Sequence, residues 1–280
     1  MVVKYRDSLV KHLPDLKLEL VNQHKKIPKK LSQAQYELEQ LSYCLEATCF
    51  SVRELLLNAN ELVRKYEEMG KKGQGILVAT QDRDPLAFLV DNFLDCIRRA
   101  QNAVCPYISR ALSVSTPISL SDLTKNINSG KIELPHEISK LITDYWTRYG
   151  DKIKSYRDLA QHFRVVSSEA CLKFDSYGRG YLYLVLPNNP EAKNESHLIW
   201  EKPFVHAIPY VIENFFVLIE VLTILVEKLL KKPVEKYIPV VEFSTKGFSI
   251  PTELYSIPSV EDFDKKVESY RKKVSERDVA

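Results

Sequence analysis

The feature that most constrains this chain is an almost wholly apolar run between residues 204 and 230, long enough to span a lipid bilayer. Three carboxylates interrupt it at seven-residue intervals, at Glu213, Glu220 and Glu227. On a helix this spacing drifts by only about 20° per step, so the carboxylates form one narrow polar stripe. Carrying three such charges through a bilayer would cost several kcal/mol. The run therefore predicts the central helix of a soluble bundle.

Three further segments carry apolar residues at three- and four-residue steps, the spacing of a helix with one apolar face. The first, at 32–69, contains neither glycine nor proline and predicts one long helix. The second begins at Asp84-Pro85, where a capping residue precedes a proline suited to the first helical turn. It is expected to end near Pro106 or a little beyond. The third extends over residues 134–163.

A change of period after residue 162 predicts a small β-structure. The β-prone runs at 170–174 and 181–186 flank a turn-rich segment, which is typical of a β-hairpin. Residues 198–200 are expected to return as a third short strand. The glycine-rich stretch after residue 69 predicts a loop as far as residue 84, and 113–131 predicts a surface connection with one short helical turn.

These elements predict a mainly α fold: an antiparallel bundle of four long helices with a small inserted β-hairpin. The 280-residue chain is 45% hydrophobic and 28% charged, which suits a single globular domain. Within residues 1–280 we expect a basic N-terminal arm at 1–31 and the bundle at 32–232. The hairpin insertion is expected at about 168–202 and a C-terminal extension at 233–280. That extension should contain a last amphipathic helix near 260–276.

Composition and the first residues predict a cytoplasmic protein, and composition alone does not indicate a function. The formal net charge of +3 is too small for bulk charge to imply a polyanionic partner. Five cysteines without a C-x-x-C pair are typical of reduced thiols and not of a disulfide framework. The first residues are charged too early for a secretory signal.

One cluster has residue types that point to chemistry, at the end of the 134–163 helix, which can bend at Gly150. Asp158 and His162 are four residues apart and share a face, so the carboxylate can orient the imidazole. Arg157 and His162 are five apart and lie about 140° apart around a regular helix. They reach one ligand only if the helix ends or loosens before His162, or if a second protomer completes the site.

The segment from Arg157 to His162 resembles the R-x4-H motif of the HEPN superfamily, in which a polar residue commonly follows the arginine. The predicted bundle at 32–232 also resembles the fold of that superfamily, with the motif before the last long helix. The resemblance implies a metal-independent endoribonuclease without a cofactor, of toxin or defence type, for which a protein antitoxin is a possible partner. It also implies a homodimer whose two motifs meet across the interface. Asp158 occupies a position where asparagine is frequent.

The residue types suit RNA cleavage by the 2′-hydroxyl. This reaction needs groups that transfer protons near neutral pH, as histidine does. It also needs a cation where charge develops on the phosphate, and a guanidinium fits phosphate oxygens. Arg157 is therefore expected to bind phosphate, His162 to transfer protons and Asp158 to orient His162. One histidine supplies only one of the two proton transfers, which is a reason to expect a symmetric dimer.

Four lysines of the N-terminal arm are candidates for electrostatic contacts with RNA phosphates: Lys25, Lys26, Lys29 and Lys30. A solvated linker is the plainer explanation of such a run. Likewise, alternating tyrosines on the predicted hairpin can stack on bases or merely pack across strands. They are Tyr177, Tyr181 and Tyr183.

Two rival functions remain open from the sequence. In the first, the cluster at 157–162 is an ion-pair network that fixes the helix end, and the chain is a non-catalytic module binding a protein or nucleic acid. In the second, a metal is held by the Glu213, Glu220 and Glu227 stripe or by Glu133 and His136, although Pro135 separates that pair and no second copy exists. Solvent exposure explains the stripe more simply.

Overall fold

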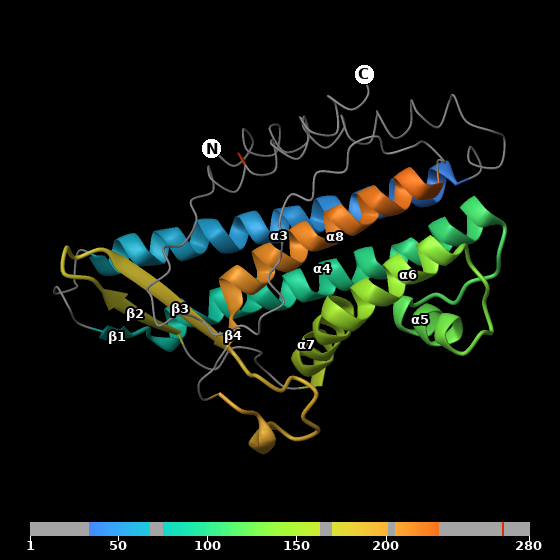
Figure 1. The fold of residues 1–280 in the computed structure, drawn as a ribbon. Helices are drawn as coiled ribbons and strands as arrows, with labels where there is room; N and C mark the ends of the chain where they lie inside the picture. The colour runs from blue at the N-terminus through green and yellow to red at the C-terminus, as the bar shows by residue number, and fades with distance from the viewer. Residues whose placement is uncertain (1–33, 68–74, 163–169, 201–204, 230–264, 266–280) are drawn as a thin grey trace.

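The computed structural model describes residues 34–67, 75–162, 170–200, 205–229 and Lys265 (Figure 1). The helices are α3 (Gln35–Glu67), α4 (Thr80–Leu112), α5 (Leu120–Asn128), α6 (His136–Tyr145), α7 (Asp151–His162) and α8 (Ala207–Leu229). The strands are β1 (Gly75–Leu77), β2 (Ala170–Phe174), β3 (Gly180–Leu186) and β4 (Val205–His206). A mainly α fold with a small antiparallel sheet is thus confirmed. The basic arm and its four lysines lie outside the described residues, as does the C-terminal helix apart from Lys265.

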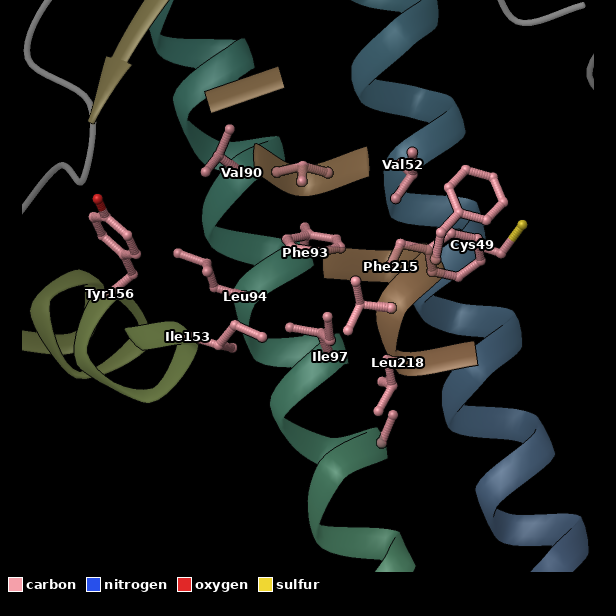
Figure 2. Close-up of a cluster of buried hydrophobic side chains, with 14 of the residues drawn as sticks. Cys49, Val52, Val90, Phe93, Leu94, Ile97, Ile153, Tyr156, Phe215 and Leu218 are labelled. Carbon is pink, nitrogen blue, oxygen red and sulfur yellow. The ribbon is translucent and has the colours of Figure 1, made fainter. Parts of the chain in front are cut away.

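The core forms where α4 lies between α3, α7 and α8 (Figure 2). Phe93, Leu94 and Ile97 of α4 are fully buried, and side chains of the neighbouring helices surround them. The partners drawn in Figure 2 include Val52 of α3, Ile153 and Tyr156 of α7, and Phe215 and Leu218 of α8. Fully burying each such side chain stabilises the fold by roughly 1.5–3 kcal/mol. This packing, more than local propensity, fixes how the helices lie.

The helix α4 is longer at both ends than the sequence predicts. It begins at Thr80, so Pro85 lies within it and Asp84 does not cap it. It also continues through Pro106 to Leu112, where Ser113 takes a left-handed conformation with φ 57°. A proline inside a helix removes one backbone hydrogen bond. The burial of Tyr107 and Ile108 immediately after Pro106 offsets that loss, which is a tertiary contribution that spacing alone does not show.

The predicted 134–163 helix consists of α6, a five-residue π-helix at Trp146–Gly150, and α7. The expected irregularity at Gly150 takes the form of this π-turn. A Cβ atom on Gly150 would lie 2.7 Å from Cε3 of Trp146, so the buried indole leaves no room for a larger residue. The wider turn therefore depends on the contact between Trp146 and Gly150.

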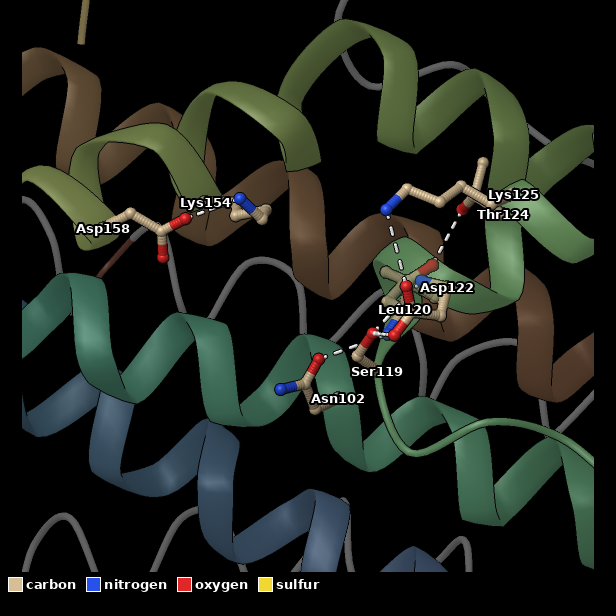
Figure 3. Close-up of polar contacts among 8 residues, drawn as sticks. All are labelled: Asn102, Ser119, Leu120, Asp122, Thr124, Lys125, Lys154 and Asp158. Carbon is tan, nitrogen blue, oxygen red and sulfur yellow. Dashed lines mark hydrogen bonds and ion pairs between the residues drawn. The ribbon is translucent and has the colours of Figure 1, made fainter. Parts of the chain in front are cut away.

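The segment expected to be a surface connection contains the nine-residue helix α5. Ser119 caps it: its hydroxyl oxygen accepts a hydrogen bond from the Asp122 backbone N–H at 3.1 Å (Figure 3). The Asn102 side chain of α4 accepts another from the Leu120 N–H at 3.2 Å. The S-x-x-D spacing is that of a capping box, and here the Ser119 hydroxyl also donates to the Asp122 carboxylate at 2.7 Å. It marks this helix start more reliably than the surrounding polar composition does.

The sheet has the order β1-β2-β3-β4 and every pair is antiparallel. The predicted hairpin is β2–β3, with Leu172 opposite Leu182. Its turn is held by Asp175, whose Oδ1 accepts hydrogen bonds from the backbone of Tyr177 and Arg179. Two edge strands were not predicted, because β1 and β4 are only three and two residues long. The prediction of a third strand at 198–200 is wrong, because these residues form no strand.

The apolar run forms α8, and its helical prediction is confirmed. By length and composition, it is the one helix among the described residues that could cross a membrane, and half of its most apolar window is buried. Its side chains pack against α3, α4, α6 and β3. His206 caps its first turn, since Nδ1 accepts a hydrogen bond from the Ile208 N–H at 3.3 Å. Nε2 lies 2.9 Å from the Leu182 carbonyl oxygen and must carry the proton.

His206 should make stability depend on pH. Burial lowers the pKa of His206 to about 4, so its stabilising contribution is complete above the unfolded value near 6.5 and is lost as pH falls toward 4. Replacing it with leucine should lower the free energy of unfolding at pH 7, and the gap to wild type should shrink by about 2 kcal/mol at pH 4.5. Urea unfolding at the two pH values measures this. For His197→Leu, at an exposed site, the difference in unfolding free energy from wild type should be the same at both pH values. If the difference for His206→Leu were also the same at both pH values, His206 would not be a buried neutral imidazole.

Candidate functional site

The helix α7 carries all three residues of the predicted site, and its buried face sets where they lie. Ile153, Tyr156 and Leu159 are buried against the core. The Tyr156 hydroxyl also donates a hydrogen bond to the Pro187 carbonyl oxygen at 2.6 Å, which ties α7 to the segment after β3. Arg157 and Asp158 are consequently half-buried at the border of this face, whereas His162 is exposed.

Arg157 connects α7 to α4. Its Nε donates a hydrogen bond to Oδ1 of Asp95 at 3.0 Å, and its Nη1 lies 3.6 Å from Oδ1 of Asp158. The guanidinium thus lies between one carboxylate from each helix. Ion pairs at such partly exposed positions contribute about 0–1 kcal/mol, so a phosphate could replace a carboxylate at small cost.

Asp158 has contacts other than the one that its spacing predicts. Its carboxylate contacts Lys154 at 2.5 Å (Figure 3). It also lies 3.6 Å from Arg157, and the contacts found among the described residues do not include His162. Lys154 lies one turn earlier on α7, at the four-residue spacing that brings opposite charges together on a helix surface. The expectation that Asp158 orients His162 is therefore not supported by the observed contacts.

His162 is the final residue of α7, and the helix neither ends nor loosens before it. The directions of Arg157 and His162 therefore differ by about 140° around the helix axis. Of the two routes to a shared ligand that the sequence leaves open, local unwinding is excluded for the described helix. For the Arg157 and His162 side chains of the described helix, the route that remains is completion of the site by a second protomer.

A second, buried arginine lies behind the cluster. Arg98 of α4 donates a hydrogen bond to Gln101 at 2.9 Å, and its guanidinium stacks 5.1 Å from the centre of the Trp146 ring. Gln101 in turn donates to the Tyr145 hydroxyl at 2.8 Å. Burial lowers the pKa of Arg98, and the Asp158 carboxylate opposes that shift. This network anchors α4 to α6 and adds positive charge beneath Arg157.

Asp91 is a candidate that the sequence does not reveal. It lies one helical turn before Asp95 on α4, and its Oδ1 is buried without a hydrogen-bond partner among the described residues. Burial, and to a lesser degree the neighbouring Asp95, raises the pKa of Asp91 to about 7. A carboxyl group that titrates near neutrality can donate or accept a proton. Two aspartates at this spacing are common on helices, so only the tertiary environment identifies the group.

The other candidates lie apart from this cluster. Tyr177 is exposed at the hairpin turn with the Arg179 guanidinium 5.6 Å from its ring centre, whereas Tyr183 is buried on β3. Glu213 and Glu220 lie near Tyr149, where burial first and then these carboxylates raise the pKa of the tyrosine. In the described part of the chain, no group of three His, Cys, Asp or Glu side chains is placed to hold a metal ion.

Comparisons of the chain with models of protein families, with curated proteins and with solved structures found no match. Only the residues of the chain itself therefore bear on its function.

The raised pKa of Asp91 has a consequence for stability. A carboxyl whose folded pKa exceeds its unfolded value stabilises the fold fully below about pH 4, and this contribution is lost as pH rises through 7. Relative to wild type, Asp91→Asn should therefore gain stability between pH 4.5 and pH 7.5, by about 1–2 kcal/mol once the full linkage value of about 3 kcal/mol is reduced for the partial solvent exposure of Asp91. Denaturant unfolding at both pH values measures the change.

Asp82→Asn is the matched control, since a hydrogen bond from Lys65 lowers the pKa of Asp82. This substitution should have the opposite pH dependence. Equal effects of Asp91→Asn at pH 4.5 and 7.5 would show that Asp91 is not desolvated in solution.

Proposed function

We propose that the chain is a HEPN-like, metal-independent endoribonuclease that acts as a homodimer. The observation that carries the proposal is a half-buried guanidinium, that of Arg157, on the same short helix as the exposed imidazole of His162. In the proposed fold, α3, α4, the α6–α7 unit and α8 are the four long helices of an antiparallel bundle.

Arg157 would bind the scissile phosphate by exchanging Asp95 for phosphate oxygens, whose geometry the planar guanidinium matches. The RNA 2′-hydroxyl loses its proton and attacks phosphorus, and the bond from phosphorus to the 5′-oxygen breaks as that oxygen gains a proton. The products are a 2′,3′-cyclic phosphate and a 5′-hydroxyl. His162 would perform one of these proton transfers.

A dimer would supply what one chain lacks. Because α7 stays helical to His162, the imidazole diverges from the guanidinium of its own chain. A twofold axis near the end of α7 would bring two guanidinium groups and two imidazoles to one RNA strand, enough for both proton transfers. Asp91 is a further group that could exchange a proton there, because it titrates near neutrality on the helix that bears Asp95.

A toxin or defence role in the cytoplasm, with a protein antitoxin as partner, belongs to the same proposal and rests on the family resemblance. The N-terminal lysines Lys25, Lys26, Lys29 and Lys30 would add phosphate contacts that weaken as salt rises.

One observation favours a second candidate, the non-catalytic binding module. Arg157 is already paired with Asp95 and Asp158, as expected of an ion-pair network that joins two helices. In that case RNA or a protein would bind without turnover.

The ribonuclease proposal is tested with His162→Ala. Purified wild-type protein should cleave single-stranded RNA in the presence of EDTA and leave 2′,3′-cyclic phosphate ends. Loss of general acid–base catalysis should lower the rate by about 100-fold or more. The thermal midpoint should change little, because His162 is exposed.

His136→Ala, at an exposed site on α6, is the matched control and should retain full activity. RNA binding without cleavage by the wild type would favour the binding module. Unfolding of the His162 variant would instead indicate a structural cluster.

A second test concerns the carboxylate that competes with phosphate. Asp95→Asn should release Arg157 and tighten RNA binding by about two- to five-fold, the equivalent of a pair contributing up to about 1 kcal/mol. Fluorescence anisotropy with labelled RNA measures the Kd. Asp144→Asn removes the same charge from an exposed position on α6 and should change affinity less. Equal gains from both variants would show a general charge effect and not a site at Arg157.

A further inference from the structure

The helix α3 has an exposed apolar stripe in addition to the face that it buries in the core. Tyr36, Tyr43 and Phe50 are 67%, 64% and 52% exposed. They follow one another at seven-residue intervals, and the half-buried Leu57 continues the series. We call these four residues the α3 stripe. The spacing is that of a coiled-coil seam, which drifts by only about 20° per heptad.

The α3 stripe lies opposite the core. Leu41, Thr48 and Leu55 are buried, and each lies two residues before a member of the stripe. Two residues correspond to about 200° around a helix, so the stripe points away from α4 and α8. The other large exposed apolar residues in the described structure are scattered over separate elements. An ordered row of three aromatic side chains is therefore unlike ordinary surface exposure and marks an interaction surface.

Carboxylates flank this row. Glu46 lies between Tyr43 and Phe50 in the sequence, Glu54 lies between Phe50 and Leu57, and Glu61 follows one turn after Leu57. Residues three or four apart are neighbours on a helix surface. The surface therefore fits a second helix that has an apolar seam and basic flanks.

We propose that the C-terminal segment at 260–274 of the same chain docks on the α3 stripe as an amphipathic helix. Its apolar residues alternate at three- and four-residue steps, the a/d spacing of a heptad: Val260, Phe263, Val267, Tyr270 and Val274. Basic residues flank them at Lys266, Arg271 and Lys273. Lys265, which the structure describes, has a helical backbone and an exposed side chain.

The connection is long enough for this arrangement. Residues 230–259 separate the end of α8 from the segment, and an extended chain of that length spans up to about 100 Å. By comparison, α3 is about 50 Å long. Because α8 packs against α3, the connection starts beside α3 and has to pass around it to reach the stripe.

A second copy of α3 fits the surface less well. Self-pairing would place Glu46, Glu54 and Glu61 of one copy near those of the other. Like charges flanking a helical seam are unfavourable. The lysines and arginine of the C-terminal segment would instead meet these carboxylates.

Hydrogen exchange of the full-length protein tests the proposal and does not depend on RNA cleavage. In wild type, amides at 260–274 should be protected. Tyr43→Ser combined with Phe50→Ser should reduce that protection at least ten-fold and leave α4 and α8 unchanged. Phe88→Ser, which removes a side chain 61% exposed on α4, is the matched control and should leave protection intact.

A charge-reversal cycle tests the predicted pairing. Glu46→Lys with Glu54→Lys should weaken protection at 260–274, as should Lys266→Glu with Lys273→Glu. All four changes together should restore it. The proposal would be overturned if the amides at 260–274 were unprotected in wild type. It would also be overturned if their protection were unchanged in the Tyr43 and Phe50 variant. A dimer by light scattering that dissociates in the Tyr43 and Phe50 variant would overturn it too, because the occupant would then be a second copy.

Discussion

The structure depends on the burial of α4 among α3, α7 and α8. Phe93, Leu94 and Ile97 each contact a different part of this environment, and their burial holds the helices at fixed positions. Hydrophobic burial is non-directional, so it fixes proximity but not register. Register comes from polar contacts at the edges of the core: the Ser119 cap, the Arg98–Gln101–Tyr145 network and the cap that His206 gives α8.

That packing also determines the electrostatics of the candidate site. Arg157 meets Asp95 because α7 crosses α4 there, and Asp91 is desolvated one turn earlier on α4. Arg157 thus has carboxylate partners that a phosphate could replace, and Asp91 is a separate carboxyl whose pKa burial raises to about 7. The exposed imidazole of His162 lies on another side of α7, which is why the proposed ribonuclease requires two chains. The α3 stripe lies on the far side of α3 from α4, so its occupant would not cover the Arg157 cluster directly.

How well sequence predicted each part follows from the range of the interactions involved. The helices at 35–67 and 207–229 were predictable to within a few residues, because their apolar spacing is long and uninterrupted. The β2–β3 hairpin was predictable because its strands flank a local turn around Asp175. The start of α4 differs from the predicted Asp84-Pro85 because the preceding turn is held by α3, whose Lys65 and Tyr66 donate hydrogen bonds to Asp82. Strands β1 and β4 are too short to carry a periodic signal and exist only through pairing with β2 and β3.

The sequence by itself determined the helical character of the chain, its hairpin and the residue types of the Arg157–His162 motif, because these depend on neighbours within a few positions. Only the tertiary structure decided which partners those residues have. Asp158 pairs with Lys154 and Arg157, Arg157 pairs with Asp95 from a helix some sixty residues earlier, and Asp91 loses its solvent. Desolvation and ion pairing act through space. The order of residues along the chain does not specify which distant side chains will lie next to one another in the fold.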